Sequence, residues 1–226
     1  VTLTDDAGKY SFNTLTPGTW TIRATAPGYA TKTISPVSVP RSTDLEIGLV
    51  PLSGSIELSV RTPFLDLTHG FVSGSGVFMY VDGYKDRKGT LEVVPHPSFK
   101  TITTALPKAG ISVQKDGSQT FEFSNYDQLI DCPIEIGNQD VFEFNAAGVK
   151  HSVAIYGVGN YEVEKLKTDM KRVIETTSAI IGENPNKNYT FIIHNVTDGQ
   201  GGLEHMNSAT LSVDRWSYQG KQYIDF

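Results

Sequence analysis

The hydrophobic pattern of this chain changes its period near residue 155, and this change constrains the fold more than any other feature. Before it, short runs of β-forming residues alternate with Gly, Pro, Asn and Asp, which is typical of strands joined by turns. From 161 to 181 apolar residues recur at helical spacing, and Gly182 is expected to end that helix. The sequence therefore predicts a mainly β chain, with two β-sandwich-like units followed by an α+β segment.

The expected strands are short and are separated by turn residues. In the first 50 residues they are 10–12, 20–24 and 31–34, with turns at 5–8, 16–18 and 26–28 and a Pro-bounded connector over 36–51. The later ones are 55–60, 77–81, 90–94, 119–123, 141–144, 152–156, 189–193 and 208–213. Residues 77–81 have the apolar run of a buried strand, and Gly159 and Asn160 are candidates to cap the helix.

Composition narrows the function classes. The chain has 226 residues, of which 19 are Lys or Arg and 25 are Asp or Glu, so its net charge is −6. This balance disfavours nucleic acid as a partner, since nucleic-acid binding needs a basic surface. No apolar run approaches the roughly 20 residues that span a bilayer, so no membrane insertion is predicted. Cys132 is the only cysteine and is expected to be a small packed side chain.

Residues 1–50 resemble the carboxypeptidase regulatory-like domain, a small β-sandwich. The resemblance rests on the segments 4–12, 15–18 and 26–29, with their Ala-Gly, Thr-Pro-Gly and Ala-Pro-Gly turns. The change of period places a second boundary near residue 155. The expected organisation is therefore an incomplete β-sandwich over 1–50, a larger β domain over 51–154, and a separate α+β segment over 155–226.

The stretch from Gly201 to His205 has the composition of a ligand-binding edge. Gly201 and Gly202 let another backbone approach closely, and Leu203 continues the stretch toward the next strand. A strand with an open edge can hold an extended peptide by main-chain hydrogen bonds. Glu204 could then bind the ammonium group of a peptide N-terminus as a charge-assisted pair.

This layout resembles the glycine-rich exopeptidase motif of aminopeptidase N relatives. Over 53–226 the chain also resembles the glycyl aminopeptidase family of zinc peptidases, which are of the gluzincin type. The matching segments are 59–61, 126–137, 148–156, 183–191 and 201–208, and they occur in the family's order. The resemblance implies a β domain followed by a thermolysin-like catalytic domain, of which 155–226 would be the beginning, and usually a PDZ domain.

One departure from the family limits what can be carried over. The His-Glu-x-x-His helix, which supplies two zinc ligands and the general base, is absent from this sequence. The chain is therefore expected to contain no catalytic residue and no metal ligand, and to be inactive alone, with Zn bound only in a longer protein. Gly201, Gly202, Leu203, Glu204 and His205 are the expected substrate-binding residues. The substrate would be a peptide with a free N-terminus, with small residues such as Gly or Ala favoured.

Other titratable groups favour structural roles. A metal site formed by His194, Glu204 and His205 has no recognised ligand spacing. The other histidines, His69, His96 and His151, are scattered singly, which is typical of surface or packed residues. Three acids of the segment 126–137 are expected to cap turns or meet Arg partners; they are Asp127, Asp131 and Glu135.

Two alternative functions remain open. A binding module could use the aromatic residues Trp20, Tyr29 and Tyr84 to hold carbohydrate or an envelope protein, and residues 1–50 could act only as a spacer. Both chain ends have the pattern of structured sequence, so a longer parent protein is expected. The bacterial envelope or exterior is the expected location, with the cytoplasm as the alternative. An incomplete sandwich could also complete itself by strand exchange, so a homo-dimer is one expectation.

Overall fold

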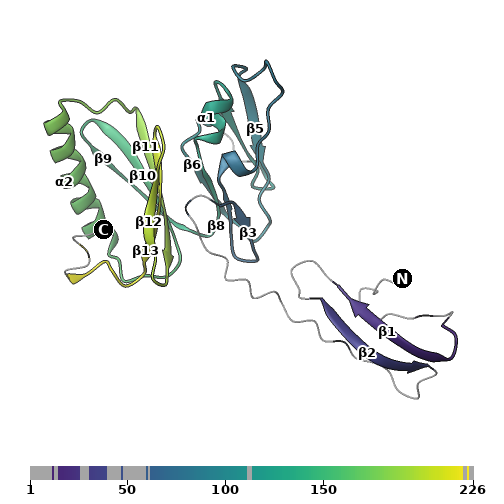
Figure 1. Ribbon diagram of the computed structural model, residues 1–226. Helices are drawn as coiled ribbons and strands as arrows, with labels where there is room; N and C mark the ends of the chain where they lie inside the picture. The colour runs from purple at the N-terminus through teal and green to yellow at the C-terminus, as the bar shows by residue number, and fades with distance from the viewer. Residues whose placement is uncertain are drawn as a thin grey trace. The chain divides into compact units, whose positions relative to one another are not determined.

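The computed structural model describes residues 12, 15–25, 31–39, 47, 60, 62–110, 114–220 and 223. The chain divides into two compact units, Val1–Glu57 and Leu58–Phe226 (Figure 1). Strands account for 42% of the structure and helices for 16%, so the predicted mainly β class is confirmed. The turns expected at 5–8 and 26–28, and most of the strands expected at 10–12 and 55–60, lie outside the described residues.

The described part of the first unit is an antiparallel strand pair. Strand β1 (Gly18–Ala24) pairs with β2 (Lys32–Val39). The second strand continues through Pro36 to Val39, where a connector was predicted. The pairing is irregular there, because Trp20 pairs with Val37 and Ile22 with Ile34. Proline is tolerated at such a bulge because no ladder hydrogen bond is needed from its nitrogen.

The second unit begins with two small antiparallel sheets. One has the order β3 (Phe64–Leu65), β4 (Gly70–Val72), β8 (Ile134–Gly137) and β6 (Thr101–Thr104). The other pairs β5 (Gly89–Val93) with β7 (Gln119–Phe123). A 3-10 turn, η1 (Gly74–Gly76), and a short helix, α1 (Tyr126–Ile130), lie between strands. The strands predicted at 90–94 and 119–123 are confirmed.

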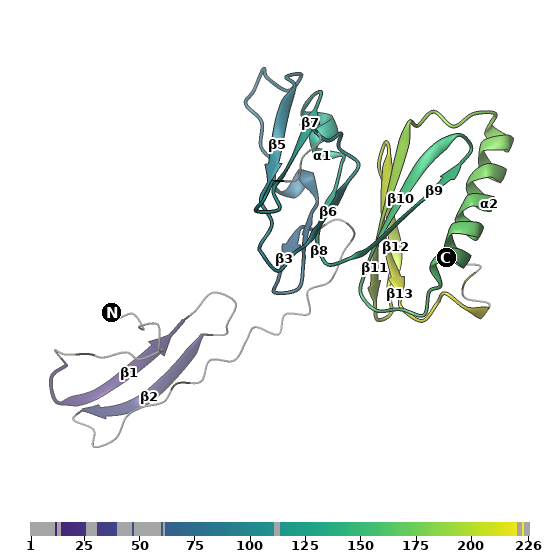
Figure 2. The ribbon, with the colours of Figure 1, turned by 180° about the vertical axis from the view of Figure 1, so that it is seen from behind.

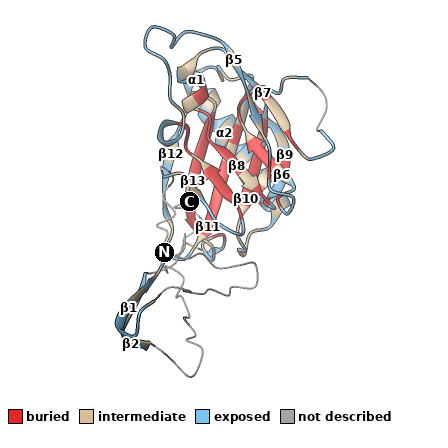
Figure 3. Ribbon diagram, turned by 90° about the vertical axis from the view of Figure 1, so that its right-hand side faces the viewer, coloured by how far each residue is buried: buried red, intermediate tan, exposed pale blue. Residues whose placement is uncertain are grey.

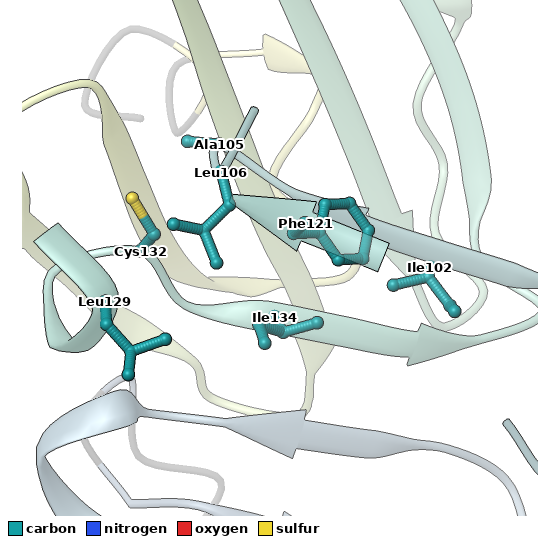
Figure 4. Packing of buried hydrophobic residues seen from close by; sticks show 7 residues of the cluster. All are labelled: Ile102, Ala105, Leu106, Phe121, Leu129, Cys132 and Ile134. Atoms are coloured by element: carbon teal, nitrogen blue, oxygen red, sulfur yellow. The ribbon is translucent and has the colours of Figure 1, made fainter. Parts of the chain in front are cut away.

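An apolar cluster fills this part of the unit (Figure 4). Phe121 and Ile134 are each 1% exposed, and Leu129 of α1 packs against the same cluster. Cys132 is 2% exposed, which confirms the prediction of a packed side chain. Burial, and secondarily the charge of Asp131, raises the pKa of the Cys132 thiol to about 12, so the thiol stays protonated and inert.

The buried strand predicted at 77–81 is wrong. These residues form a turn and an irregular segment after η1, and Met79 is 93% exposed. The backbone N–H groups of Val77 and Phe78 are bonded to the carbonyl oxygen of Gly74, and the Phe78 carbonyl accepts the Tyr126 hydroxyl at 2.8 Å. These backbone groups are committed to turn and side-chain bonds, so an apolar run alone did not make a strand.

The rest of the second unit is a five-stranded sheet of order β12, β13, β11, β10, β9. Their bounds are Asp140–Ala146 for β9, Val149–Tyr156 for β10, Asn188–Val196 for β11, Gln200–Glu204 for β12 and Ser208–Asp214 for β13. Strands β10, β11 and β13 are parallel, whereas β9 and β12 are antiparallel edges. The strands predicted at 141–144, 152–156, 189–193 and 208–213 are confirmed. Because β10 pairs with β11, the sheet continues across residue 155.

Helix α2 (Val163–Ile181) makes the crossover between β10 and β11, as a parallel pair requires. It ends at Gly182, whose φ of 101° is readily adopted only by glycine, as predicted. The predicted cap is wrong, because the N-cap is Glu162 rather than Gly159 or Asn160, and its side chain makes no capping bond. The Asn160 side chain instead donates to the Trp216 carbonyl at 3.1 Å. Within the described residues, no helix combines the length and apolar character needed to cross a membrane.

Figures 1 and 2 show α2 along one face of the five-stranded sheet, with the four-stranded sheet on the opposite side. An apolar cluster joins the helix to the sheet and includes Leu166 of α2, Val153 of β10 and Ile193 of β11. Figure 3 shows buried segments in red at the centre of the view, where β8, β10, β11 and β13 are labelled. The second half of α2 differs, because Ile180 is 80% exposed and Val173 is 65% exposed.

Leu166 tests the packing of this layer. The substitution Leu166→Ala removes a side chain that is 1% exposed and should lower the free energy of unfolding by about 2–5 kcal/mol, because it leaves a cavity. The same change at Leu67, which is 97% exposed, should alter it by less than about 0.5 kcal/mol. Chemical denaturation of both variants measures the difference, and equal effects would contradict the described packing.

Candidate functional site

The predicted substrate-binding residues lie on the outer strand of the five-stranded sheet. Strand β12 carries Gly201, Gly202, Leu203 and Glu204, and it pairs only with β13 among the described residues. The pairing runs from Gln200 opposite Val213 to Glu204 opposite Ala209. The other edge of β12 therefore offers unpaired backbone groups in the described structure, which is what strand addition by an extended peptide requires.

At two positions of β12 the local structure favours glycine over a residue with a Cβ atom. Gly201 has a φ of +158°, at the border of the region that favours glycine, and a Cβ there would meet nothing within 4 Å. A Cβ on Gly202 would lie 3.1 Å from Cδ2 of Leu211. Both glycines are exposed, so another chain can approach this edge closely.

Acidic groups gather at the end of β12. The Glu204 side chain is exposed, and its charge interacts electrostatically with the Tyr189 side chain of β11. Burial first, and then the negative charges of Glu204 and Asp131, raise the pKa of the Tyr189 phenol. The Tyr189 hydroxyl donates to the Ser208 carbonyl at 3.0 Å. Such a negative corner favours a cation, including an ammonium group.

The residues after Glu204 form a braced turn. His205 N donates to the Ser208 carbonyl at 2.8 Å and closes the turn between β12 and β13. The Asp131 carboxylate accepts one bond from His205 Nδ1 at 2.9 Å and another from the Met206 amide at 2.9 Å. The far nitrogen, His205 Nε2, is buried and has no hydrogen-bond partner in the described part of the chain. Asp131 thus connects the end of α1 to the end of β12.

A second polar cluster lies between the two larger sheets. Glu135 of β8 accepts from His69 Nδ1 at 2.7 Å through one carboxylate oxygen and from His194 Nε2 at 2.8 Å through the other. Glu135 and His194 are 0% exposed and His69 is 1% exposed. Tyr156 stacks on the His69 ring at 3.3 Å between centroids, and its hydroxyl donates to Thr68 Oγ1 at 2.6 Å. The cluster therefore joins β8, β11 and the segment before β4.

Two opposed effects act on the Glu135 carboxyl. Burial alone raises its pKa, because a charge loses hydration, but the hydrogen bonds from His194 and His69 outweigh that effect and lower the pKa below its ordinary value. Glu135 is therefore ionised at neutral pH, and each imidazole presents an N–H to it. The ion is stabilised by two directional bonds rather than by water.

This cluster has a ligand set that zinc accepts, but its geometry does not fit a zinc centre. Two ligand atoms on one tetrahedral zinc lie about 3.3 Å apart, since each bond is about 2.0–2.1 Å long. The carboxylate and imidazole atoms here are 2.7 and 2.8 Å apart, which is hydrogen-bond spacing. The three ligand residues are also buried, whereas a catalytic zinc needs an open position. In the described residues the cluster is best explained as a hydrogen-bonded clamp.

The histidine and acidic residues that the sequence analysis considered together have different partners in the structure. His194 lies with Glu135 and His69 rather than with Glu204 and His205. Asp127 pairs with Lys85 at 2.7 Å on the surface, as expected of a structural acid. His151 is 2% exposed, and burial lowers its pKa despite a bond to the Val149 carbonyl.

The aromatic residues of the binding-module alternative are only partly described. Trp20, on β1, is 36% exposed and its indole nitrogen donates to the Thr16 carbonyl at 3.0 Å. Tyr84, in the second unit, is 57% exposed, and the Arg87 guanidinium lies 5.4 Å from its ring centroid. Tyr29 lies outside the described residues.

The sequence matches the peptidase M61 N-terminal domain over residues 2–138, which is more than half of the chain. The chain belongs to this family. The M61 match includes α1 and β8, and therefore Asp131 and Glu135. No curated protein sequence matches the chain.

The likeness of this M61 chain to one solved structure extends past the N-terminal domain. An aminopeptidase N family protein from Idiomarina loihiensis is 32% identical, with a TM-score of 0.66 over 76% of this chain. The chain spans 30% of the length of that relative. A Legionella pneumophila aminopeptidase A, in complex with aspartic acid, is 9% identical with a TM-score of 0.46 over 66% of this chain and 19% of its own.

Replacing Glu135 by Gln tests the clamp. The variant Glu135→Gln should lose about 3 kcal/mol of unfolding free energy at neutral pH, because the charge that both imidazoles contact is gone. The folded-state pKa of Glu135 is lowered, so its contribution is complete above the ordinary value of about 4.3 and disappears as pH falls through the folded-state value.

Denaturation at a series of pH values measures the wild-type advantage over Glu135→Gln. The matched control is Glu143→Gln, which breaks an exposed pair with Lys150 and should cost less than about 1 kcal/mol. An advantage that grows as the solution is acidified below pH 4 would contradict the assigned sign.

The zinc content of the 226-residue chain tests directly whether the cluster of His69, Glu135 and His194 binds zinc. After dialysis against a buffer with trace zinc, elemental analysis should find almost none, because Glu135 already bonds both imidazoles. About one zinc per chain, abolished by His194→Gln, would show that the cluster rearranges into a metal site.

Proposed function

We propose that this chain is the N-terminal part of an M61-type aminopeptidase and supplies part of its substrate site. In this proposal an extended peptide with a free N-terminus adds to the outer edge of β12, and Glu204 binds its ammonium group. The chain alone has no hydrolytic activity. Because it spans 30% of the Idiomarina relative, a longer protein would provide the remaining machinery.

The observation that carries the proposal is the placement of Glu204. It ends an edge strand whose glycines are exposed, so an added peptide strand would end beside a carboxylate. Main-chain bonds to β12 would hold the peptide in any sequence, whereas a carboxylate at the strand end selects a free N-terminus. This combination suits an exopeptidase that removes residues from the amino end.

The zinc chemistry of the proposed enzyme would come from outside this chain. A bound zinc would polarise the scissile carbonyl and activate water. The sequence contains no His-Glu-x-x-His segment, and the buried cluster of Glu135 does not fit the ion. The residues of this chain would instead orient the peptide and neutralise its terminal charge.

The exposed apolar side chains of α2 suit contact with another part of the longer protein. Val173, Ile180 and Ile181 are between 65% and 80% exposed, whereas Val163, Leu166 and Met170 of the same helix belong to the cluster that packs on the sheet. Clustered apolar residues on a surface mark contact sites. In the proposed longer protein, a catalytic segment would cover them.

Glu204→Ala in the longer M61-type peptidase tests the substrate site. The variant should lower kcat/KM on free-amine aminoacyl substrates about 10–100-fold, because a charge-assisted bond to the ammonium is lost. A free-amine dipeptide should inhibit the wild type better than its N-acetylated form, and Glu204→Ala should lose that preference.

The matched control for Glu204→Ala is Glu183→Ala, another exposed acid, which follows α2. It should leave both the specificity constant and the preference for the free amine unchanged. Wild-type kinetics in Glu204→Ala would remove Glu204 from the substrate site.

A further inference from the structure

Asp131 is distant in sequence from Glu204 but bonded to the residues that follow it. It is the C-cap of α1, and its carboxylate reaches His205 and Met206 at 2.9 Å each. The His205 side chain is 10% exposed and that of Asp131 is 38% exposed. Since each carboxylate oxygen has its own partner, the turn is fixed at two points rather than hinged at one.

The same turn is attached to its surroundings by the next residue. Asn207 accepts a bond from Cys132 Sγ at 3.7 Å and donates to the Ala105 carbonyl at 3.5 Å. The Asn207 carbonyl accepts the Thr190 amide at 3.1 Å. Both Ala105 and Cys132 are in the buried cluster of Figure 4, so the turn is fixed to a rigid part of the molecule.

Strand β12 needs this support because it has only one neighbour in the described sheet. Its five residues include two glycines, which give the least ordered backbone, and it pairs only with β13. A terminal residue of such a strand frays unless something beyond it is fixed. Here the fixed points begin one residue after Glu204.

We propose that Asp131 is a positioning residue for Glu204, acting through His205 and the Met206 amide to hold the amine-binding carboxylate at one place on the sheet edge. This inference rests on the proposed role of Glu204. In this role Asp131 holds the turn rather than the substrate, since each of its oxygens already accepts a bond within the protein. Its charge adds to the negative corner beside Tyr189 but is not the site of binding.

A double-mutant cycle in the longer M61-type peptidase tests the proposal. Asp131→Asn cannot accept both bonds at once and should lower kcat/KM for a free-amine substrate about 5–10-fold. In a Glu204→Gln background the same change should lower it less than about 2-fold, because the group that Asp131 positions is already gone. A general structural defect would instead lower kcat/KM equally in both backgrounds.

The control is Asp127→Asn, the same chemical change in the same short helix, at an exposed acid paired with Lys85. It should leave kcat/KM unchanged in both backgrounds. An equal loss from Asp131→Asn in both backgrounds would overturn the positioning role, whether Asp131 binds substrate independently or only stabilises the fold. If Glu204→Gln itself has no effect, the proposed function fails first.

Amide hydrogen exchange of the 226-residue chain gives a readout that needs no activity. In Asp131→Asn the Met206 amide and the end of β12 should exchange about 10-fold faster or more, while the amides of β10 and β11 keep their wild-type protection. Unchanged protection at Met206 would overturn the proposal even if the longer peptidase had no aminopeptidase activity.

Discussion

Glu135 is the constraint on which the arrangement of the second unit depends. It lies on β8, one of the two inner strands of the four-stranded sheet, and it bonds His194 of the five-stranded sheet. A buried carboxylate is costly unless it is hydrogen-bonded, and here each oxygen accepts a bond from one imidazole. Because these bonds are directional, they favour one placement of the sheets, which apolar contacts alone would leave less defined.

The five-stranded sheet has two chemically different faces, and this difference orders the layers. The face toward α2 is apolar and packs as a continuous cluster. The opposite face of the sheet includes polar side chains that are nonetheless buried, such as Thr190, His194 and Thr210. A helix with an apolar stripe suits the first face, whereas polar side chains such as Glu135 can satisfy the second. The alternation of β11 and β13 therefore decides on which side each layer packs.

Local pattern predicted most of the strands because their signals are local. The alternation in β7 and the switch to helical spacing in α2 are properties of adjacent residues, and both were predicted. The clamp could not be predicted this way, because His69 and His194 lie 66 and 59 residues from Glu135 and share no motif with it. The strand prediction for residues 77–81 was wrong for a related reason. A strand needs a neighbouring strand, and this segment has none in the described structure.

An edge that binds peptide has two opposing requirements. It must leave backbone groups unpaired, yet an exposed edge is also where chains associate wrongly. β12 is short, contains two glycines and ends in the charged Glu204, features that weaken adventitious pairing. The same features weaken the strand itself, so its order must come from outside the ladder. The segment that starts at Asp131 and includes Glu135 supplies that order, because it bonds both the turn after β12 and the strand two places inward. The proposed binding edge is thus stabilised by a part of the chain that the bound peptide need not contact.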